Sequence, residues 1–156
     1  MEQRISLWEK GQGAVKAMWG INSFLAKSGL EQSLLNLMYF RVSQINGCAY
    51  CLDMHAKDMR AAGESEQRLY MIAAWEESPV YTSRERAALA WAEAVTELHK
   101  GHVPDEVYET VRKEFSEEEI IALTMALVAI NGYNRMNVAF RTHAGSYEPG
   151  QFAAAH

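Results

Sequence analysis

The sequence has few cysteines and no long apolar segment. Its two cysteines, Cys48 and Cys51, are too few for the disulfide framework of a small secreted domain. No stretch reaches the ~18 consecutive apolar residues of a membrane-spanning helix, and the longest apolar-rich run, residues 120–130, is interrupted by Thr124. The N-terminus leads into no apolar signal core. We therefore expect a cytoplasmic protein that does not enter a membrane.

Positive charge is also scarce. There are 15 Lys and Arg residues against 20 Asp and Glu, which gives a net charge of −5, and the basic residues form no run. Nucleic-acid-binding domains usually carry a basic stripe or patch. The composition thus argues against a nucleic-acid partner.

What the sequence does contain is helical periodicity along nearly its whole length. We find no alternating strand pattern, no internal repeat and no linker, and 156 residues suit one domain of ~100–200 residues. The prediction is an all-α fold with a single domain over residues 1–156. About seven helices are expected, at residues 7–28, 31–45, 48–62, 65–77, 82–100, 104–115 and 116–141.

Boundary signals support several of these helices. Thr82 with Glu85, and Ser116 with Glu119, have the spacing of a capping box. Gly63 suits the position after a helix C-terminus. The segment from residue 143 onward is rich in Gly, Ala and Pro, and we expect it to be mobile.

The third expected helix carries the chemistry, because it holds C-x-x-C followed by a histidine. At about 100° per residue, Cys48, Cys51 and His55 share one face, and His55 lies one turn beyond Cys51. Leu52, Met59 and Ala62 continue this face, whereas Asp53 and Lys57 lie opposite. We therefore expect both sulfurs and the imidazole to point inward.

This arrangement suits thiol redox chemistry. The thiolate is the nucleophile, and a helix N-terminus or a nearby imidazolium lowers a cysteine pKa, while burial raises it. We expect the first two effects to prevail at Cys51, so that it reacts faster than Cys48 near neutral pH. The i, i+3 spacing also permits a disulfide if the first turn adapts.

Other interpretations remain open. The cysteines could be small core residues. They could bind zinc with His55 and a fourth ligand from His99, His102 or His143. Covalent haem is excluded because it needs histidine directly after the second cysteine, where Leu52 stands. We predict no metal and no cofactor.

The long last helix also carries polar side chains, and tryptophans recur along the chain. Asn131, Asn134, Arg135 and Asn137 either form a buried network that fixes packing, or line the thiol pocket or a subunit contact. The stripes rich in Met and Trp are interpreted as core.

The segment around the cysteines resembles a known family. RVSQINGCAYCLDMH at 41–55 is similar to the signature of the alkyl hydroperoxidase D-like (AhpD-like) branch of the carboxymuconolactone decarboxylase superfamily, and so are residues 63–69, 81–91 and 129–138. The resemblance covers roughly residues 15–147. It implies an all-α homo-oligomer, either a trimer or a hexamer, with thiol peroxidase or disulfide reductase activity and no bound metal. Lactone decarboxylation is disfavoured, since the true decarboxylases lack the cysteine pair.

The resemblance also implies roles for individual residues. Cys51 would be the peroxidatic thiol, Cys48 the resolving thiol, and His55 part of the proton relay, with a hydroperoxide as substrate and an external dithiol as reductant. The family usually has a glutamate twelve residues before the first cysteine, but here Asn36 stands in that place. An amide cannot take up a proton as a carboxylate does. The alternative prediction is therefore a redox sensor or structural oligomer whose Cys48–Cys51 pair cycles with little peroxidase turnover.

Overall fold

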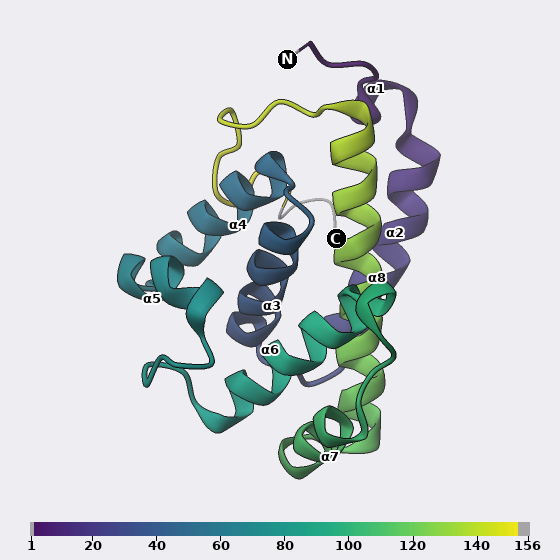
Figure 1. Ribbon diagram of the computed structural model, residues 1–156. Coiled ribbons are helices and arrows are strands. Elements are labelled where there is room, and N and C mark those ends of the chain that lie inside the picture. The colour runs from purple at the N-terminus through teal and green to yellow at the C-terminus, as the bar shows by residue number, and fades with distance from the viewer. Residues whose placement is uncertain (1, 153–156) are drawn as a thin grey trace.

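The chain folds into helices, as a computed structural model describing residues 2–152 shows (Figure 1). No strand occurs within that range, so the all-α prediction is confirmed. The α-helices are α1 (Leu7–Lys10), α2 (Gln12–Leu25), α3 (Gln32–Ile45), α4 (Ala49–Ala61), α5 (Glu66–Met71), α6 (Ser83–Thr96), α7 (Asp105–Glu114) and α8 (Glu117–Phe140). Two short 3₁₀ helices follow α5 and α6, at Ile72–Ala74 and Leu98–Lys100. Among residues 2–152, no helix is long and apolar enough to cross a membrane.

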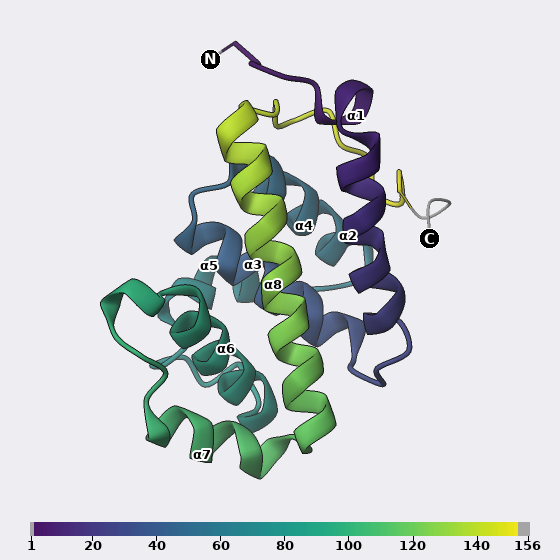
Figure 2. The same cartoon turned by 90° about the vertical axis from the view of Figure 1, so that its right-hand side faces the viewer.

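The longest helix, α8, organises the molecule. Helix α2 lies beside α8, while α6 and α7 pack at one end of α8 (Figure 2). Helix α3 lies between α8, α6 and α4. The main core forms where these helices meet, and its fully buried side chains include Met38, Val42, Leu123 and Leu127.

The first predicted helix is wrong in one respect, because it is two helices joined at Gly11. Ser6 caps α1 by accepting a hydrogen bond from the Glu9 N–H, and Gly11 serves as the C-cap. A Cβ at Gly11 would lie 2.7 Å from both the Leu7 Cδ1 atom and the Leu7 carbonyl oxygen. Only glycine permits this tight junction, which lets α1 turn away from α2.

The ends of two other helices were placed too late. The prediction carried the fourth helix to residue 77, but its α-helical part ends at Met71. The Arg86 guanidinium donates to the carbonyl oxygens of Trp75, Glu76 and Ser78, at 2.7, 2.7 and 3.1 Å, so these acceptors are satisfied outside a helical ladder. Similarly, α6 ends at Thr96 and gives way to a 3₁₀ turn.

The capping predictions are confirmed. Both capping boxes form, at the start of α6 and of α8. Gly63 follows the C-cap of α4 with a φ of +92°, and its N–H donates to the Arg60 carbonyl at 3.0 Å. These local signals fix where α4, α6 and α8 lie in the sequence.

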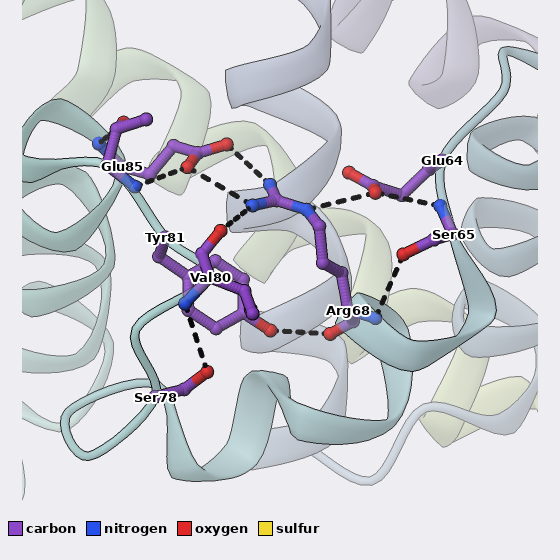
Figure 3. Close-up of polar contacts among 8 residues, drawn as sticks. Glu64, Ser65, Arg68, Ser78, Val80, Tyr81 and Glu85 are labelled. Atoms are coloured by element: carbon purple, nitrogen blue, oxygen red, sulfur yellow. Dashed lines mark hydrogen bonds and ion pairs between the residues drawn. The ribbon is translucent and has the colours of Figure 1, made fainter.

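Arg68 ties the start of α5 to the start of α6 (Figure 3). Its guanidinium donates to Glu64 at 2.9 Å and to Glu85 at 2.5 Å, and it also bonds the Val80 carbonyl. The Tyr81 hydroxyl closes the network by donating to the Arg68 carbonyl at 2.5 Å. Because Glu64 and Glu85 both pair with its charge, this partly buried arginine holds the loop between α5 and α6 in place.

The segment after α8 was expected to be mobile, but residues 143–152 pack against α4 (Figure 1, yellow). Lys57 donates to the carbonyls of Gly145 and Tyr147 at 3.0 and 2.9 Å, and Asp53 accepts from the Gly145 N–H at 2.9 Å. The polar face of α4 is therefore covered by this segment. The rest of the expected mobile tail, residues 153–156, lies outside the described residues.

Candidate thiol site

The site is built on the N-terminus of α4. Asn46 ends α3, and Gly47 turns the chain with a φ of +65°, which favours glycine. Cys48 is then the N-cap of α4, and its Sγ accepts a hydrogen bond from the Cys51 N–H at 3.4 Å. Both sulfurs thus lie where the free N–H groups of the first turn favour negative charge.

The inward face predicted for α4 is confirmed. Cys48 and Cys51 are each 1% exposed and His55 is 7% exposed, and both cysteines are free thiols. Met59 continues the buried face, whereas Ala62, expected on the same stripe, is exposed. The prediction identified the correct face up to the last turn of the helix.

Amides from α8 reach the sulfurs. Asn137 Nδ2 donates to Cys51 Sγ at 3.5 Å. Asn134 lies beside both cysteines and donates to Ser43 Oγ at 3.1 Å, while its Oδ1 accepts from Asn46 Nδ2 at 2.9 Å. Asn134 and Asn137 thus form a buried network and also lie at the thiol site, and Asn131 joins the network through Asn46. Arg135, predicted with them, is exposed.

The acidity of the two thiols differs from the expectation. The Cys51 thiol hydrogen-bonds to Cys48, which lowers the pKa of Cys48, helped by backbone N–H groups and by Asn134. The same hydrogen bond, together with burial and the Cys48 charge, raises the pKa of Cys51. The first proton lost by the pair therefore leaves a negative charge on Cys48, because two buried sulfurs in contact do not both ionise readily.

His55 also differs from the expectation. Its Nε2 atom is buried and has no hydrogen-bond partner among the described residues. Burial lowers its pKa to about 4, so the imidazole is neutral near pH 7 and gives no cation to stabilise a Cys51 thiolate. Its ring contacts that of Tyr39, with centroids 5.4 Å apart.

No carboxylate takes over the position of Asn36. Its Oδ1 accepts from Gln32 Nε2 at 2.9 Å. Of the two acids nearest in sequence, Glu31 pairs with Arg84 at 3.0 Å and Asp53 pairs with Lys57 at 3.1 Å. Neither acid is therefore free to act as a proton acceptor for the thiols.

A cavity of about 740 Å³ opens beside Cys51. Cys51, His55, Asn36 and Asn137 all line it, but Cys48 does not. The structure thus brings three of the four residues singled out from the sequence to one cavity and places Cys48 behind Cys51. Its size is within the ~300–1,000 Å³ typical of small-molecule sites.

The sequence interpretation missed the aromatic side chains of this cavity. It assigned the tryptophans to the core, which is right for Trp75 and Trp91, but Trp8 and Trp19 line the cavity, and Trp8 is 39% exposed. Trp8 stacks on Phe152 with ring centroids 4.6 Å apart.

Zinc binding was left open from the sequence. Among residues 2–152, no three His, Cys, Asp or Glu side chains lie together in a group that could hold a metal ion. His99 and His102 thus do not complete a site with the cysteine pair.

Comparisons with known proteins place this site in a family. The uncharacterised protein YdfG of Bacillus subtilis is 38% identical over 146 residues, which cover 94% of this chain and 99% of YdfG. A crystal structure of a protein of unknown function from Agrobacterium tumefaciens, proposed to be an AhpD antioxidant defence protein, has 42% identity and a TM-score of 0.88. It covers 94% of this chain and 100% of that chain, so the fold is AhpD-like.

More distant structures share the fold alone. The debrominase Bmp8 has a TM-score of 0.77 at 21% identity, over 88% of this chain and 74% of its own. Residues 12–94 match the sequence profile of the carboxymuconolactone decarboxylase family. This match covers more than half of the chain and includes the cysteine pair, so the chain belongs to the carboxymuconolactone decarboxylase family.

Proposed function

We propose that this protein is a thiol-dependent peroxidase for organic hydroperoxides, in which Cys51 reacts with the peroxide and Cys48 resolves the product as a disulfide. The observation that carries the proposal is the placement of the sulfurs: Cys51 lines the cavity, and Cys48 lies behind it in hydrogen-bond contact. The likeness to an AhpD-type protein at 42% identity supports it further.

The two sulfurs share one proton before the reaction. Once the pair has lost one proton, the charge lies on Cys48 and the remaining proton on Cys51. Transfer of this proton along the existing hydrogen bond gives a Cys51 thiolate facing the cavity, where Asn137 Nδ2 can donate to it. Cys48 is then the base, which neither His55 nor Asn36 is suited to be.

The reaction then balances within the pair. The Cys51 thiolate attacks the terminal oxygen of ROOH, so that an S–O bond forms and the O–O bond breaks. The leaving alkoxide takes the proton from Cys48 and departs as ROH. The regenerated Cys48 thiolate attacks the Cys51 sulfenic acid to form the disulfide, and the released hydroxide takes a proton from solvent.

An external dithiol completes the cycle. It reduces the Cys48–Cys51 disulfide by thiol–disulfide exchange and is itself oxidised to a disulfide. Since the first turn of α4 carries both sulfurs, that turn must adapt when the S–S bond forms.

The test is peroxide consumption with dithiothreitol as reductant. Cys51→Ser should abolish turnover of cumene hydroperoxide, because the attacking sulfur is gone. In the absence of dithiothreitol, Cys48→Ser should consume about one equivalent and then hold Cys51 as a sulfenic acid, detectable by mass spectrometry as its dimedone adduct. If Cys51→Ser keeps the activity of the parent, or if the adduct forms on Cys48 in that variant, the proposed roles are wrong.

One observation favours a second candidate, a redox sensor with little turnover. Asn36 is engaged with Gln32, and the two acids nearest to it and to the cysteines in sequence, Glu31 and Asp53, are paired with cations. Steady-state kinetics of the parent beside Asn36→Glu would distinguish the two candidates. A large gain in rate, together with an oxidation-dependent change in the native mass of the parent, would favour the sensor over the peroxidase.

A further inference from the structure

The walls of the cavity beside Cys51 are mainly aromatic. Seven aromatic side chains line it, and they come from α1, α2, α3, α4, α8 and the segment after α8. Phe152 stacks on Trp8 and contacts Tyr147, with centroid separations of 4.6 and 5.7 Å, so the segment after α8 forms one wall. Flat faces from several directions favour a ring-shaped ligand, because stacked and edge-on ring contacts add to the gain from burial.

Charge is nearly absent from these walls. The described lining has two charged side chains, Lys27 and Asp58. Lys27 is exposed, and Asp58 already accepts the hydroxyl hydrogen of Tyr147, which lies 2.8 and 2.9 Å (oxygen to oxygen) from its two carboxylate oxygens. Burial raises the pKa of Tyr50 to about 12, so its hydroxyl is uncharged at neutral pH. A charged ligand would lose its hydration and meet only an exposed lysine or a carboxylate already engaged by a hydroxyl.

One polar atom in the lining is left without a partner. His55 Nε2 is buried and has no hydrogen-bond partner among residues 2–152, although His55 lines the cavity. A buried nitrogen without a partner destabilises the protein, and a ligand that pairs with it recovers that free energy.

From these observations we propose that the cavity binds a neutral aromatic molecule whose single hydroxyl or hydroperoxyl group hydrogen-bonds to His55 Nε2. A hydroxyl both donates and accepts, so it satisfies either tautomer of the neutral imidazole, whereas a carbonyl satisfies only one. The aromatic ring lies against Trp8, Trp19 and Tyr39.

This inference deepens the proposed function by naming its substrate class, and it rests on that function in taking the cavity to be the substrate site. The hydroperoxide would be an aryl-substituted one, and the alcohol product would occupy the same site. His55 is then a substrate-binding residue rather than the base for Cys51.

The experiment measures binding without turnover. The probes are 2-naphthol, naphthalene and 2-naphthoate, titrated calorimetrically into the Cys51→Ser protein, which cannot complete the proposed reaction. We expect 2-naphthol to bind roughly tenfold more tightly than naphthalene, which corresponds to about 1.4 kcal/mol. The carboxylate of 2-naphthoate should bind more weakly than either. Adding His55→Phe, which keeps an aromatic ring but removes the nitrogen, should bring 2-naphthol to within about twofold of naphthalene.

A second measurement guards against misfolding of the His55 variant. In the parent protein, 2-naphthol should shift the Nε2 resonance of His55 in an imidazole NMR spectrum, whereas naphthalene should leave it nearly unchanged. Equal affinities for 2-naphthol and naphthalene, tighter binding of 2-naphthoate, or an unshifted His55 resonance would each overturn the inference. If 2-naphthol binds as expected but the parent protein does not turn over peroxide, only the proposed function is overturned.

Discussion

At the scale of single residues, the feature that matters most is the proton shared by Cys48 and Cys51. The hydrogen bond between them lowers the pKa of Cys48 and raises that of Cys51. Periodicity alone placed His55 one turn from Cys51 and suggested an imidazolium partner. It could not reveal that the nearest acid–base partner of each cysteine is the other cysteine.

This coupling predicts the shape of the thiol titration. The parent should show two steps in thiolate absorbance, one below and one above the ~8.5 of a free cysteine, because the second ionisation must occur beside the first charge. Cys48→Ala and Cys51→Ala should each show a single step between those two. Ultraviolet absorbance against pH measures this directly. If the titration curve of the parent equals the sum of the two single-variant curves, the two sulfurs ionise independently.

A second residue-scale prediction concerns His55 and acid stability. Its pKa in the folded protein is about 4, below the ~6.5 of an exposed histidine, so the unfolded chain takes up a proton that the folded protein does not. The resulting stabilisation is complete above pH ~6.5 and is lost as the pH falls from there towards 4. Between these two pH values, the contribution of His55 to the free energy of unfolding changes by about 3 kcal/mol.

His55→Phe should remove this part of the pH dependence. The free energy of unfolding in urea should fall less between pH 7 and pH 4 for the variant than for the parent, by up to about 3 kcal/mol. His102→Gln, at an exposed position, is the control and should follow the parent. Parallel curves for His55→Phe and the parent would show that His55 titrates alike in the folded and unfolded chain.

At the scale of elements, local chemistry predicts where the helices lie in the sequence. It does not always predict where they end. Ser116 and Glu119, or Thr82 and Glu85, satisfy one another within four residues, so their pattern is readable in the sequence. The end of α5 depends on Arg86, a residue of another helix, whose guanidinium binds the carbonyls that leave the helix. Such a long-range partner leaves no periodic signal.

The segment after α8 gives a prediction at this scale. Tyr147 is 4% exposed, and its hydroxyl donates to both oxygens of Asp58 on α4. Tyr147→Phe should lower the free energy of unfolding by about 1–3 kcal/mol, since it leaves a carboxylate without its donor. Tyr70→Phe is a matched control, because the Tyr70 hydroxyl also donates to a glutamate but the side chain is 70% exposed. The control should change stability by less than about 0.5 kcal/mol, and equal effects of the two variants would mean that residues 143–152 do not hold α4.

At the scale of the whole molecule, the face of α4 was predictable and the surroundings of that face were not. A 100° rotation per residue assigns Cys48, Cys51 and His55 to one side of a helix. The partner of Cys51 on α8 is Asn137, 86 positions away in sequence, and the cavity joins side chains as distant as Trp8 and Phe152. Helical spacing identifies a face, whereas tertiary packing decides what lies opposite it.

The final prediction tests whether the chain unfolds as one domain, as its length and lack of linkers suggest. Helix α8 packs against α2, α3, α4, α6 and α7, and Leu127 at its middle is 0% exposed. Leu127→Ala should lower the free energy of unfolding by about 2–5 kcal/mol. Val128→Ala, one residue along the same helix but at a side chain 51% exposed, is the matched control and should cost less than about 1 kcal/mol.

The two ends of the molecule should respond to Leu127→Ala together. Trp91 and Trp75 are buried near α6, whereas Trp8 and Trp19 line the cavity beside Cys51. In a Trp8→Phe/Trp19→Phe background, tryptophan fluorescence reports on the α6 end and thiol accessibility reports on the start of α4. Because α8 contacts the helices that carry both probes, a core defect in it should shift both urea midpoints equally. Midpoints that separate in Leu127→Ala, with one probe still at the parent value, would show that the cysteine site and the α6–α7 end unfold independently.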